Sequence, residues 1–361
     1  MGYKYMFYIR ADANGIIGAG HIMRCLAVAV ELRKNLEEVV FIVADQYGQG
    51  IVESYGFKTL CLHSQWDNLE MELGIILPLV KENHVRGILV DSYYVTENYL
   101  AKLHQCTMVA YIDDVDAFIY PVDLLVNYNI YAEKMGYFKR YNDAGLDTEF
   151  LLGCSYVPLR EEFYGIQING KSDYNTILQE NNKKRKVLIT SGGSGLYNIT
   201  GILLDRLKEK DWFNNTIFYV ILGKFNQYRQ ELQEKWQVYK NVFLYENVNC
   251  ISKYMSICDI AVTAGGSTVY ELCACGLPPV MYTVADNQLG IANELASLGL
   301  VPWCGDAREN IDKCIKKIVY YMEKLLWDDK LLKKTSIELQ KLVDSCGAAR
   351  IAKELLQRFF I

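Results

Sequence analysis

The sequence has no apolar stretch of about 18 or more residues, the length that a helix needs to cross the hydrocarbon core of a bilayer. Its first residues also lack the basic start, apolar core and small-residue cleavage site of a secretory signal. We therefore expect a cytoplasmic protein that is not inserted in a membrane.

Paired cysteines are missing too, although the chain has 11 cysteines. Their number is odd, they are scattered, and no two stand in the Cys-x-x-Cys spacing of metal or redox motifs. We interpret them as buried thiols in a reducing compartment. We expect no disulfide framework, no bound metal and no cofactor.

A basic excess is also absent, because the formal net charge is −5 and the isoelectric point is near 5.6. Proteins that bind nucleic acid generally carry a basic face or stripe, so we expect no nucleic-acid partner. A diphosphate ligand needs only a few donors and stays compatible with this charge. The sequence says nothing about protein partners.

What the chain does contain is a regular alternation of short apolar segments and amphipathic segments. With 361 residues, 51% of them hydrophobic and 22% charged, it is long enough for two globular domains. Nearly continuous apolar strands between helices predict a parallel sheet covered on both faces. In the first half we expect strands at 5–10, 39–44, 85–91, 108–112 and 124–127, with helices at 22–34, 69–83 and 98–105.

The alternation breaks at a polar segment and then restarts. In the second half we expect strands at 187–190, 217–222, 242–245, 260–264 and 279–282, with helices at 228–237, 251–257, 269–275, 287–298 and from 309 onward. We predict domains at 1–165 and 187–305, a linker at 166–186 and a helical tail at 306–361. Because such sheets bind ligands beyond the carboxyl ends of their strands, two facing halves would share an interdomain cleft.

Three glycine-rich turns stand where a strand leads into a helix, at Gly15–Gly20, Ser191–Gly195 and Gly265–Thr268. Glycine lets a ligand approach the backbone, and a following helix offers free N–H groups, so the turns indicate phosphate or diphosphate binding. Each is equally a normal device for a tight turn. The first has the spacing GxxGxG rather than GxGxxG, so a dinucleotide site with Asp45 on the ribose is a weaker alternative.

Several polar residues beside these turns are candidates for chemistry. His21 follows Gly18 and Gly20 at a helix start, where the helix dipole disfavours a cation and leaves the imidazole able to accept a proton. The alternative is a histidine satisfied by backbone. Arg10 and Asp12 end the first strand, as a buried ion pair that supports the loop or as ligand contacts. Glu271 fits a capping box with Thr268, a role that competes with ligand binding.

Residues 242–301 resemble the nucleotide-sugar half of GT-B enzymes of the MurG type. The shared pattern is Gly-Gly-Ser-Thr-x-x-Glu-Leu, then Gly-x-Pro, then an Asn-Gln loop before an Asn-bearing helix. The resemblance implies that Glu271 binds the ribose hydroxyls of UDP and that Asn287 and Gln288 contact phosphate or sugar. It also implies that the turn at the diphosphate is formed by Gly265, Gly266, Ser267 and Thr268.

The N-terminal half is similar to the UDP-2,4-diacetamido-2,4,6-trideoxy-β-L-altropyranose hydrolases of the pseudaminic acid pathway. The similarity is carried by RADANGIIGAGHIMRCLAVAVEL, LVDSYYV, YIDD, LLVNYNIYA and LLGCSYVPLREEFY, and it covers roughly residues 5–302 in order. It implies an α/β fold of GT-B type, with two Rossmann-like parallel-sheet domains facing an interdomain cleft and a helical C-terminal extension that packs back on the first domain. It further implies that His21 is the catalytic base and that Tyr93 lines the sugar site.

The expected reaction is metal-independent hydrolysis of a UDP-sugar, in which water attacks the anomeric carbon and UDP leaves. Gly18 and Gly20 would let backbone amides face the leaving diphosphate, so that helix ends and donors handle its charge. Two alternatives remain open. One is a glycosyltransferase that uses the same donor with another acceptor, and the other is a UDP-sugar-binding protein without catalysis.

Overall fold

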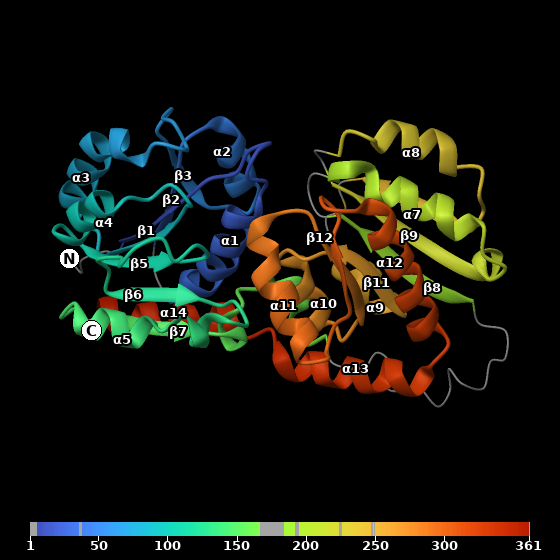
Figure 1. Cartoon of the computed structure of the whole chain (residues 1–361). Helices are drawn as coiled ribbons and strands as arrows, with labels where there is room; N and C mark the ends of the chain where they lie inside the picture. The colour runs from blue at the N-terminus through green and yellow to red at the C-terminus, as the bar shows by residue number, and fades with distance from the viewer. Residues whose placement is uncertain are drawn as a thin grey trace. The chain divides into compact units, whose positions relative to one another are not determined.

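The computed structural model describes residues 6–35, 38–166, 184–191, 195–223, 226–246, 248 and 250–360 (Figure 1). The chain divides into two compact units. The first combines Met1–Glu161 with Ser345–Ile361, and the second is Glu162–Asp344. The polar segment 166–186 of the sequence lies mostly outside the described residues.

The first unit is built on a seven-stranded sheet in the order β3-β2-β1-β4-β5-β6-β7, in which every pairing is parallel. Its strands are β1 Met6–Ala11, β2 Glu38–Val43, β3 Lys58–Cys61, β4 Gly87–Asp91, β5 Met108–Ile112, β6 Leu124–Asn127 and β7 Glu149–Leu152. The central strands β1 and β4 are buried along nearly their whole length. A sheet covered on both faces explains why their sequences are almost continuously apolar.

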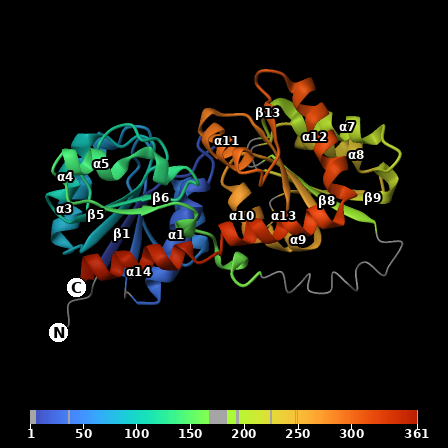
Figure 2. The same cartoon turned by 60° about the horizontal axis from the view of Figure 1, so that its bottom comes forward.

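Helices cover both faces of this sheet (Figure 1). They are α1 Gly20–Arg33, α2 Gln46–Ser54, α3 Leu73–Glu82, α4 Glu97–His104, α5 Tyr137–Asp143 and α14 Gly347–Phe360. The last helix of the chain, α14, packs against α1 (Figure 2). Its Phe359 stacks on Phe7 of β1 at 6.0 Å between ring centres, and Gly87 leaves room for that ring because a Cβ there would overlap it.

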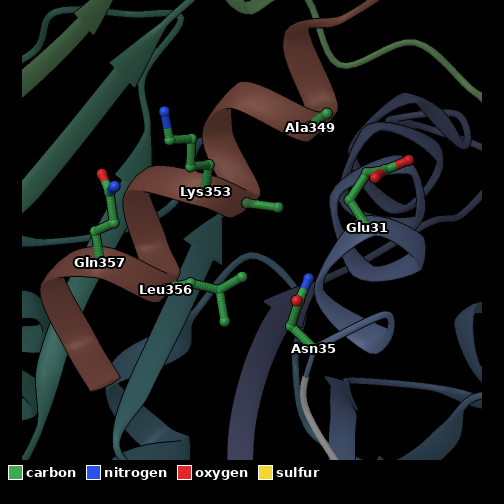
Figure 3. Close-up of a pocket in the computed structure, with 7 residues that line it drawn as sticks. Glu31, Asn35, Ala349, Lys353, Leu356 and Gln357 are labelled. Carbon is green, nitrogen blue, oxygen red and sulfur yellow. The ribbon is translucent and has the colours of Figure 1, made fainter. Parts of the chain in front are cut away.

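A surface groove of about 220 Å³ runs between α1 and α14 (Figure 3). Its lining residues are Glu31, Asn35, Ala349, Ala352, Lys353, Leu356 and Gln357. Both polar and aliphatic side chains line it, and it lies where the last helix of the chain packs on the first unit.

The second unit is built on a six-stranded parallel sheet in the order β10-β9-β8-β11-β12-β13. Its strands are β8 Arg185–Thr190, β9 Thr216–Leu222, β10 Val242–Glu246, β11 Ile260–Ala264, β12 Pro279–Thr283 and β13 Trp303–Asp306. Its helices are α7 Ile199–Lys208, α8 Arg229–Trp236, α9 Ser252–Ile257, α10 Thr268–Ala274, α11 Leu289–Ser297, α12 Ile311–Leu326 and α13 Asp329–Leu342.

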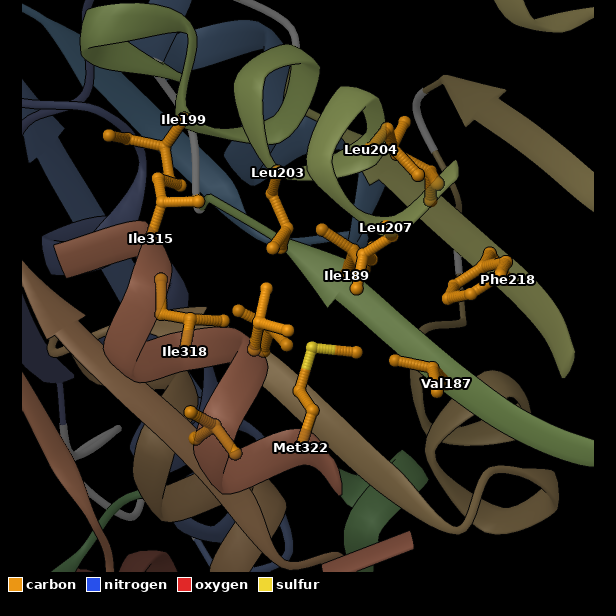
Figure 4. Close-up of a cluster of buried hydrophobic side chains, with 14 of the residues drawn as sticks. Val187, Ile189, Ile199, Leu203, Leu204, Leu207, Phe218, Ile315, Ile318 and Met322 are labelled. Carbon is orange, nitrogen blue, oxygen red and sulfur yellow. The ribbon is translucent and has the colours of Figure 1, made fainter. Parts of the chain in front are cut away.

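The core of the second unit forms where α7 and α12 pack over β8 (Figure 4). Ile189 of β8 meets Leu203 of α7 and Ile318 of α12, and all three are at most 2% exposed. The helices of the predicted tail are therefore divided between the two units. The helices α12 and α13 belong to the second unit, and only α14 belongs to the first.

Each sheet reverses its strand order beside its first strand, between β1 and β4 and between β8 and β11. Ligands of open parallel sheets bind outside the carboxyl ends of the strands at such a switch point. In the first unit those ends carry Asp12 and Asp91, and in the second they carry Ser191 and Gly265. Within the described residues, no helix has both the length and the apolar character needed to cross a membrane.

Candidate active site

The turn before α1 is closed by Asn14 and Gly18. Their backbones exchange two hydrogen bonds, from Gly18 N–H to Asn14 O at 2.9 Å and from Asn14 N–H to Gly18 O at 3.1 Å. Gly18 has a φ of +72°, which explains why glycine stands there. Its own amide is used within the turn, so the amides left to face a ligand are those of the first turn of α1.

Those first-turn amides belong to Gly20, His21 and Ile22. Met23 N–H makes the first backbone hydrogen bond of the helix, to Ala19 O at 3.0 Å, and the three amides before it have no acceptor among the described residues. Gly20 is exposed, with open space where a Cβ would stand. This end of α1 therefore presents free donors beside an unobstructed backbone.

His21 is the second residue of α1 and is only 5% exposed. Its Nδ1 lies 3.0 Å from the carboxylate oxygen Oδ1 of Asp91 and 3.3 Å from the backbone oxygen of the same residue. Its Nε2 is buried and has no hydrogen-bond partner in the described part of the chain. Only one side of the ring is satisfied, which leaves the second nitrogen available for chemistry.

Asp91 ends β4 and is held by a guanidinium. Arg24 stands three residues after His21 on the same face of α1 and donates from Nε to Oδ2 at 2.6 Å and from Nη2 to Oδ1 at 2.5 Å. Burial alone would raise the pKa of Asp91, but Arg24 and then His21 outweigh it and hold that pKa well below its usual range. Asp91 is therefore an ionised, fully buried carboxylate.

The free edge of Arg24 reaches the ends of the next two strands. Its Nη1 donates to Asp114 Oδ2, after β5, and to the hydroxyl oxygen of Tyr128, after β6, both at 2.6 Å. Asn129 donates to the other oxygen of Asp114 at 3.1 Å. One guanidinium thus pairs with two carboxylates. The cluster of Arg24, Asp91 and Asp114 therefore carries one excess negative charge while His21 is neutral.

Tyr93 lies beside His21, as a residue lining the same site would. The two rings meet edge to face with their centres 4.4 Å apart, and the Tyr93 hydroxyl is 3.5 Å from Asp114 Oδ2. The side chain is 37% exposed. The structure therefore brings His21 and Tyr93 together, and it adds Arg24 and Asp114, which the sequence analysis did not single out.

Arg10 and Asp12 form the buried ion pair that was one of the two predicted roles. Arg10 Nη1 donates to Asp12 Oδ2 at 2.5 Å, and Arg10 also holds Glu72 through two hydrogen bonds of 2.7 and 3.0 Å. Asp12 Oδ1 accepts the amide of Ala44 at 2.7 Å, which ties β1 to the end of β2. Their contacts are structural.

Asp45, the candidate ribose ligand of the dinucleotide alternative, caps α2. Its Oδ1 accepts the amides of Tyr47 and Gly48 at 2.9 and 3.0 Å. An aspartate at a helix N-cap commonly accepts such hydrogen bonds, which contribute about 1 kcal/mol to stability. The capping contacts explain the residue without any dinucleotide.

In the second unit, the turn after β11 packs against the end of β12. Gly265 donates to Tyr282 O at 2.8 Å, and a Cβ on it would lie 3.2–3.4 Å from Thr283, Met281 and Gln288. A Cβ on Gly266 would meet open space. Close packing therefore explains why a glycine stands at position 265. The packing of this unit gives no such reason for the glycine at position 266.

The capping box considered for Thr268 and Glu271 is not formed. The cap residue of α10 is Ser267, whose side chain makes no capping hydrogen bond, and Thr268 is already the first helical residue. Thr268 and Glu271 are both partly exposed. Thr268 is therefore not the cap residue of α10 that the predicted capping box requires.

The predicted Asn-Gln loop is a short 3₁₀ helix, Asp286–Gln288, placed beside Gly265. Gln288 folds back so that its Oε1 accepts Val284 N–H at 2.8 Å, while Asn287 is exposed. Arg308, which the sequence analysis missed, bonds Asp286 at 2.7 Å and Asp306 at 2.6 Å. The two predicted loops of this unit thus lie side by side where β11 and β12 end.

The remaining glycine turn follows β8, and only its ends are described. Gly192, Gly193 and Ser194 lie outside the described residues. The buried Ser191 hydroxyl has no partner among the residues that are described, and Gly195 has a φ of +59°. Within the same residues, no group of three or more histidine, cysteine, aspartate or glutamate side chains is arranged to hold a metal ion.

Comparison with known proteins gave no matching family model. An uncharacterised protein of Methanocaldococcus jannaschii is 27% identical over 280 residues, 76% of this chain and 54% of that protein. The UDP-N-acetylglucosamine–N-acetylmuramyl-(pentapeptide) pyrophosphoryl-undecaprenol N-acetylglucosamine transferase of Finegoldia magna is 25% identical, over 62% of this chain and 58% of that protein. The chain thus spans a little over half the length of these two relatives.

A third relative, from Helicobacter pylori, is called pseudaminic acid cytidylyltransferase and UDP-2,4-diacetamido-2,4,6-trideoxy-β-L-altropyranose hydrolase. It is 26% identical over 164 residues, which are 45% of this chain and 27% of that protein. The match is partial and does not by itself transfer either activity.

Solved structures agree with the fold over nearly the whole chain. MurG of Acinetobacter baumannii matches with a TM-score of 0.68 at 13% identity, over 98% of this chain and 99% of that one. UDP-GlcNAc 2-epimerase of Neisseria meningitidis matches with a TM-score of 0.64 at 13% identity, over 98% and 100%. The chain therefore has a GT-B fold of two Rossmann-like parallel-sheet domains, and the predicted fold class is confirmed.

Proposed function

We propose that the chain is an enzyme of UDP-sugars, and that it hydrolyses a UDP-linked 2,4-diacetamido-2,4,6-trideoxy sugar to UDP and the free sugar. The proposal is supported by the motifs around His21 and Glu271 and by the partial match to the Helicobacter pylori protein. The observation that carries it is the state of His21, buried with Nδ1 held by Asp91 and Nε2 without a partner among the described residues.

In this reaction His21 is the general base. Water forms a bond to the anomeric carbon, the bond from that carbon to the diphosphate oxygen breaks, and UDP leaves with the electron pair. Nε2 takes the proton of the water as it attacks. The imidazolium that results is offset by the excess negative charge of Asp91 and Asp114, so the surrounding network stabilises the charge that develops. Tyr93 lines the sugar site.

The second unit holds the nucleotide in this proposal. Glu271 binds the ribose hydroxyls, and Asn287 and Gln288 contact phosphate or sugar. The diphosphate lies at the turn formed by Gly265, Gly266, Ser267 and Thr268, and Gly18 and Gly20 shape the turn on the other unit. The proposal is supported by the adjacency of Gly265 and Gln288 and by the open space at Gly266. We further propose that the protein acts in the cytoplasm, in pseudaminic acid synthesis, without a cofactor.

A MurG-like glycosyltransferase is the second candidate, favoured by the Finegoldia magna relative and the Acinetobacter baumannii structure. A UDP-sugar-binding protein without catalysis is the third, and His21 argues against it because its Nε2 has no partner among the described residues. The three are separated by incubating the purified chain with the UDP-linked diacetamido sugar and no acceptor, with and without EDTA. Hydrolysis predicts UDP and free sugar at enzymatic rates in both samples. Release of UDP only after an acceptor is added would overturn the hydrolase in favour of the transferase.

A further inference from the structure

Among the residues that the structure describes, two acceptors and no donor contact Nδ1 of His21. Nδ1 lies 3.0 Å from Asp91 Oδ1 and 3.3 Å from Asp91 O, and both oxygens can only accept a hydrogen bond while the carboxyl is ionised. Nδ1 must therefore carry the proton of a neutral His21, and Nε2 must carry the lone pair. The carboxylate contact is the shorter of the two and is charge-assisted, so it contributes most to the choice of tautomer.

Asp91 is itself fixed by Arg24. The guanidinium donates to both carboxylate oxygens of Asp91, at 2.6 and 2.5 Å, and Asp91 is only 1% exposed. A bidentate fork fixes the plane of the carboxylate as well as its position. Since Arg24 is anchored again on Asp114 and Tyr128, Asp91 has no freedom to turn away from the histidine.

We propose that Asp91 is the positioning residue of the base, clamped by Arg24 so that His21 is held as its Nδ1–H tautomer with Nε2 as the proton acceptor. This inference rests on the proposed function, in which His21 is the base. Asp91 takes up no proton itself. The proton of the attacking water goes to Nε2, the proton on Nδ1 stays there, and the carboxylate stabilises the imidazolium.

The tautomer can be read directly in the substrate-free protein. The chain has four histidines, so selective ¹⁵N labelling gives few signals, and His21→Gln assigns the one of interest. At a pH where His21 is neutral by its own titration, the wild-type spectrum should show a protonated Nδ1 and an unprotonated Nε2. In Asp91→Asn, a signal from the Nε2–H tautomer should appear. A wild-type His21 protonated on Nε2 would overturn the inference whatever the activity.

Kinetics supply the second measurement. Partners that orient a metal-bound histidine are worth on the order of 10- to 100-fold in activity, and we take the same range for a histidine that acts as a base. We expect Asp91→Asn to lower kcat by that factor with little change in KM, because the substrate contacts remain. Arg24→Lys keeps the cation but loses the fork, and we expect a smaller loss in kcat. Should Asp91→Asn fail to fold by circular dichroism, Arg24→Lys carries both measurements.

Another histidine–carboxylate pair in the same unit provides a matched control. His104 Nε2 lies 3.1 Å from Asp123 Oδ1, and its side chain is 43% exposed. Asp123→Asn should change the His104 signal and leave kcat unchanged. A full kcat in Asp91→Asn, with an active wild type, would overturn the inference and leave the hydrolase standing. An inactive wild type with the Nδ1–H tautomer would overturn the function and leave the geometry standing.

Discussion

The Nδ1 atom of His21 lies 3.0 Å from a carboxylate oxygen of Asp91, although the two residues are 70 positions apart in the chain. The contact exists because α1 starts at the end of β1 and because β4 is the strand paired with β1. Asp91 therefore holds Nδ1 of His21, while Nε2 of the same ring has no partner among the described residues.

Replacing His21 with alanine should remove the base. We expect kcat to fall by about 10²- to 10⁴-fold, the usual contribution of a positioned general base, while the affinity for UDP changes little. Steady-state kinetics and calorimetric UDP titration test the two parts. His104→Ala is the matched control and should behave as wild type. Turnover that persists in His21→Ala would mean that the base lies elsewhere.

Replacing Glu271 with alanine should weaken UDP binding. Hydrogen bonds to a charged group contribute about 1.5–3 kcal/mol, so we expect the Kd for UDP to rise by about 10- to 100-fold. Titration calorimetry measures it, with the exposed Glu231→Ala on α8 as the control. An unchanged Kd together with a lower melting temperature would leave Glu271 a purely structural role.

Two neighbouring glycines should respond differently to alanine. At Gly265 a Cβ would stand 3.2–3.4 Å from three side chains, and overpacking of this kind costs about 1–3 kcal/mol. At Gly266 the space is open, so Gly266→Ala should keep the melting temperature but weaken UDP binding. Thermal unfolding and UDP titration of both variants provide the comparison. Normal UDP affinity in Gly266→Ala would remove this glycine from the proposed site.

The depressed pKa of Asp91 predicts how stability depends on pH. A carboxyl with a lower pKa in the folded state contributes stability that is complete above its unfolded pKa of about 3.9 and declines as pH falls toward the folded value. The difference in melting temperature between wild type and Asp91→Asn should thus shrink as the pH falls below about 4. A difference that stays the same or grows below that pH would contradict the assigned ion pair with Arg24.

The last helix should stabilise the first unit. Phe359 is 3% exposed and stacks on Phe7, so Phe359→Ala should cost about 3–5 kcal/mol of unfolding free energy. Phe138, which is 65% exposed, is the matched control and should cost far less when truncated. Denaturant unfolding measures both. Equal losses would mean that α14 adds little to the unit.

Much of the fold was predictable because buried parallel strands are continuously apolar. The strands around β1, β4, β8 and β11 were placed within a few residues of their bounds. The edge strands β3, β7 and β13 were missed, because KTLC, EFLL and WCGD are short, partly exposed and mixed in polarity. Such strands are specified by pairing with a neighbour more than by their own pattern.

The site was predictable only in part. His21 stood out by its glycine turn, and Tyr93 by the resemblance. The contacts of Arg24 with Asp91 and Asp114 span 67 and 90 positions, so they depend on strand order, which no local pattern encodes. One signal was present: Arg24 follows His21 by three residues and so shares its helix face.

The most direct test of the account is hydrolysis in ¹⁸O-labelled water with the UDP-linked diacetamido sugar and no acceptor. If water attacks the anomeric carbon with His21 as base, UDP is released at an enzymatic rate, its phosphates carry no ¹⁸O, and His21→Ala loses the release. Label in the UDP phosphates would show attack at phosphorus. Either that result or the absence of release without an acceptor would contradict the account.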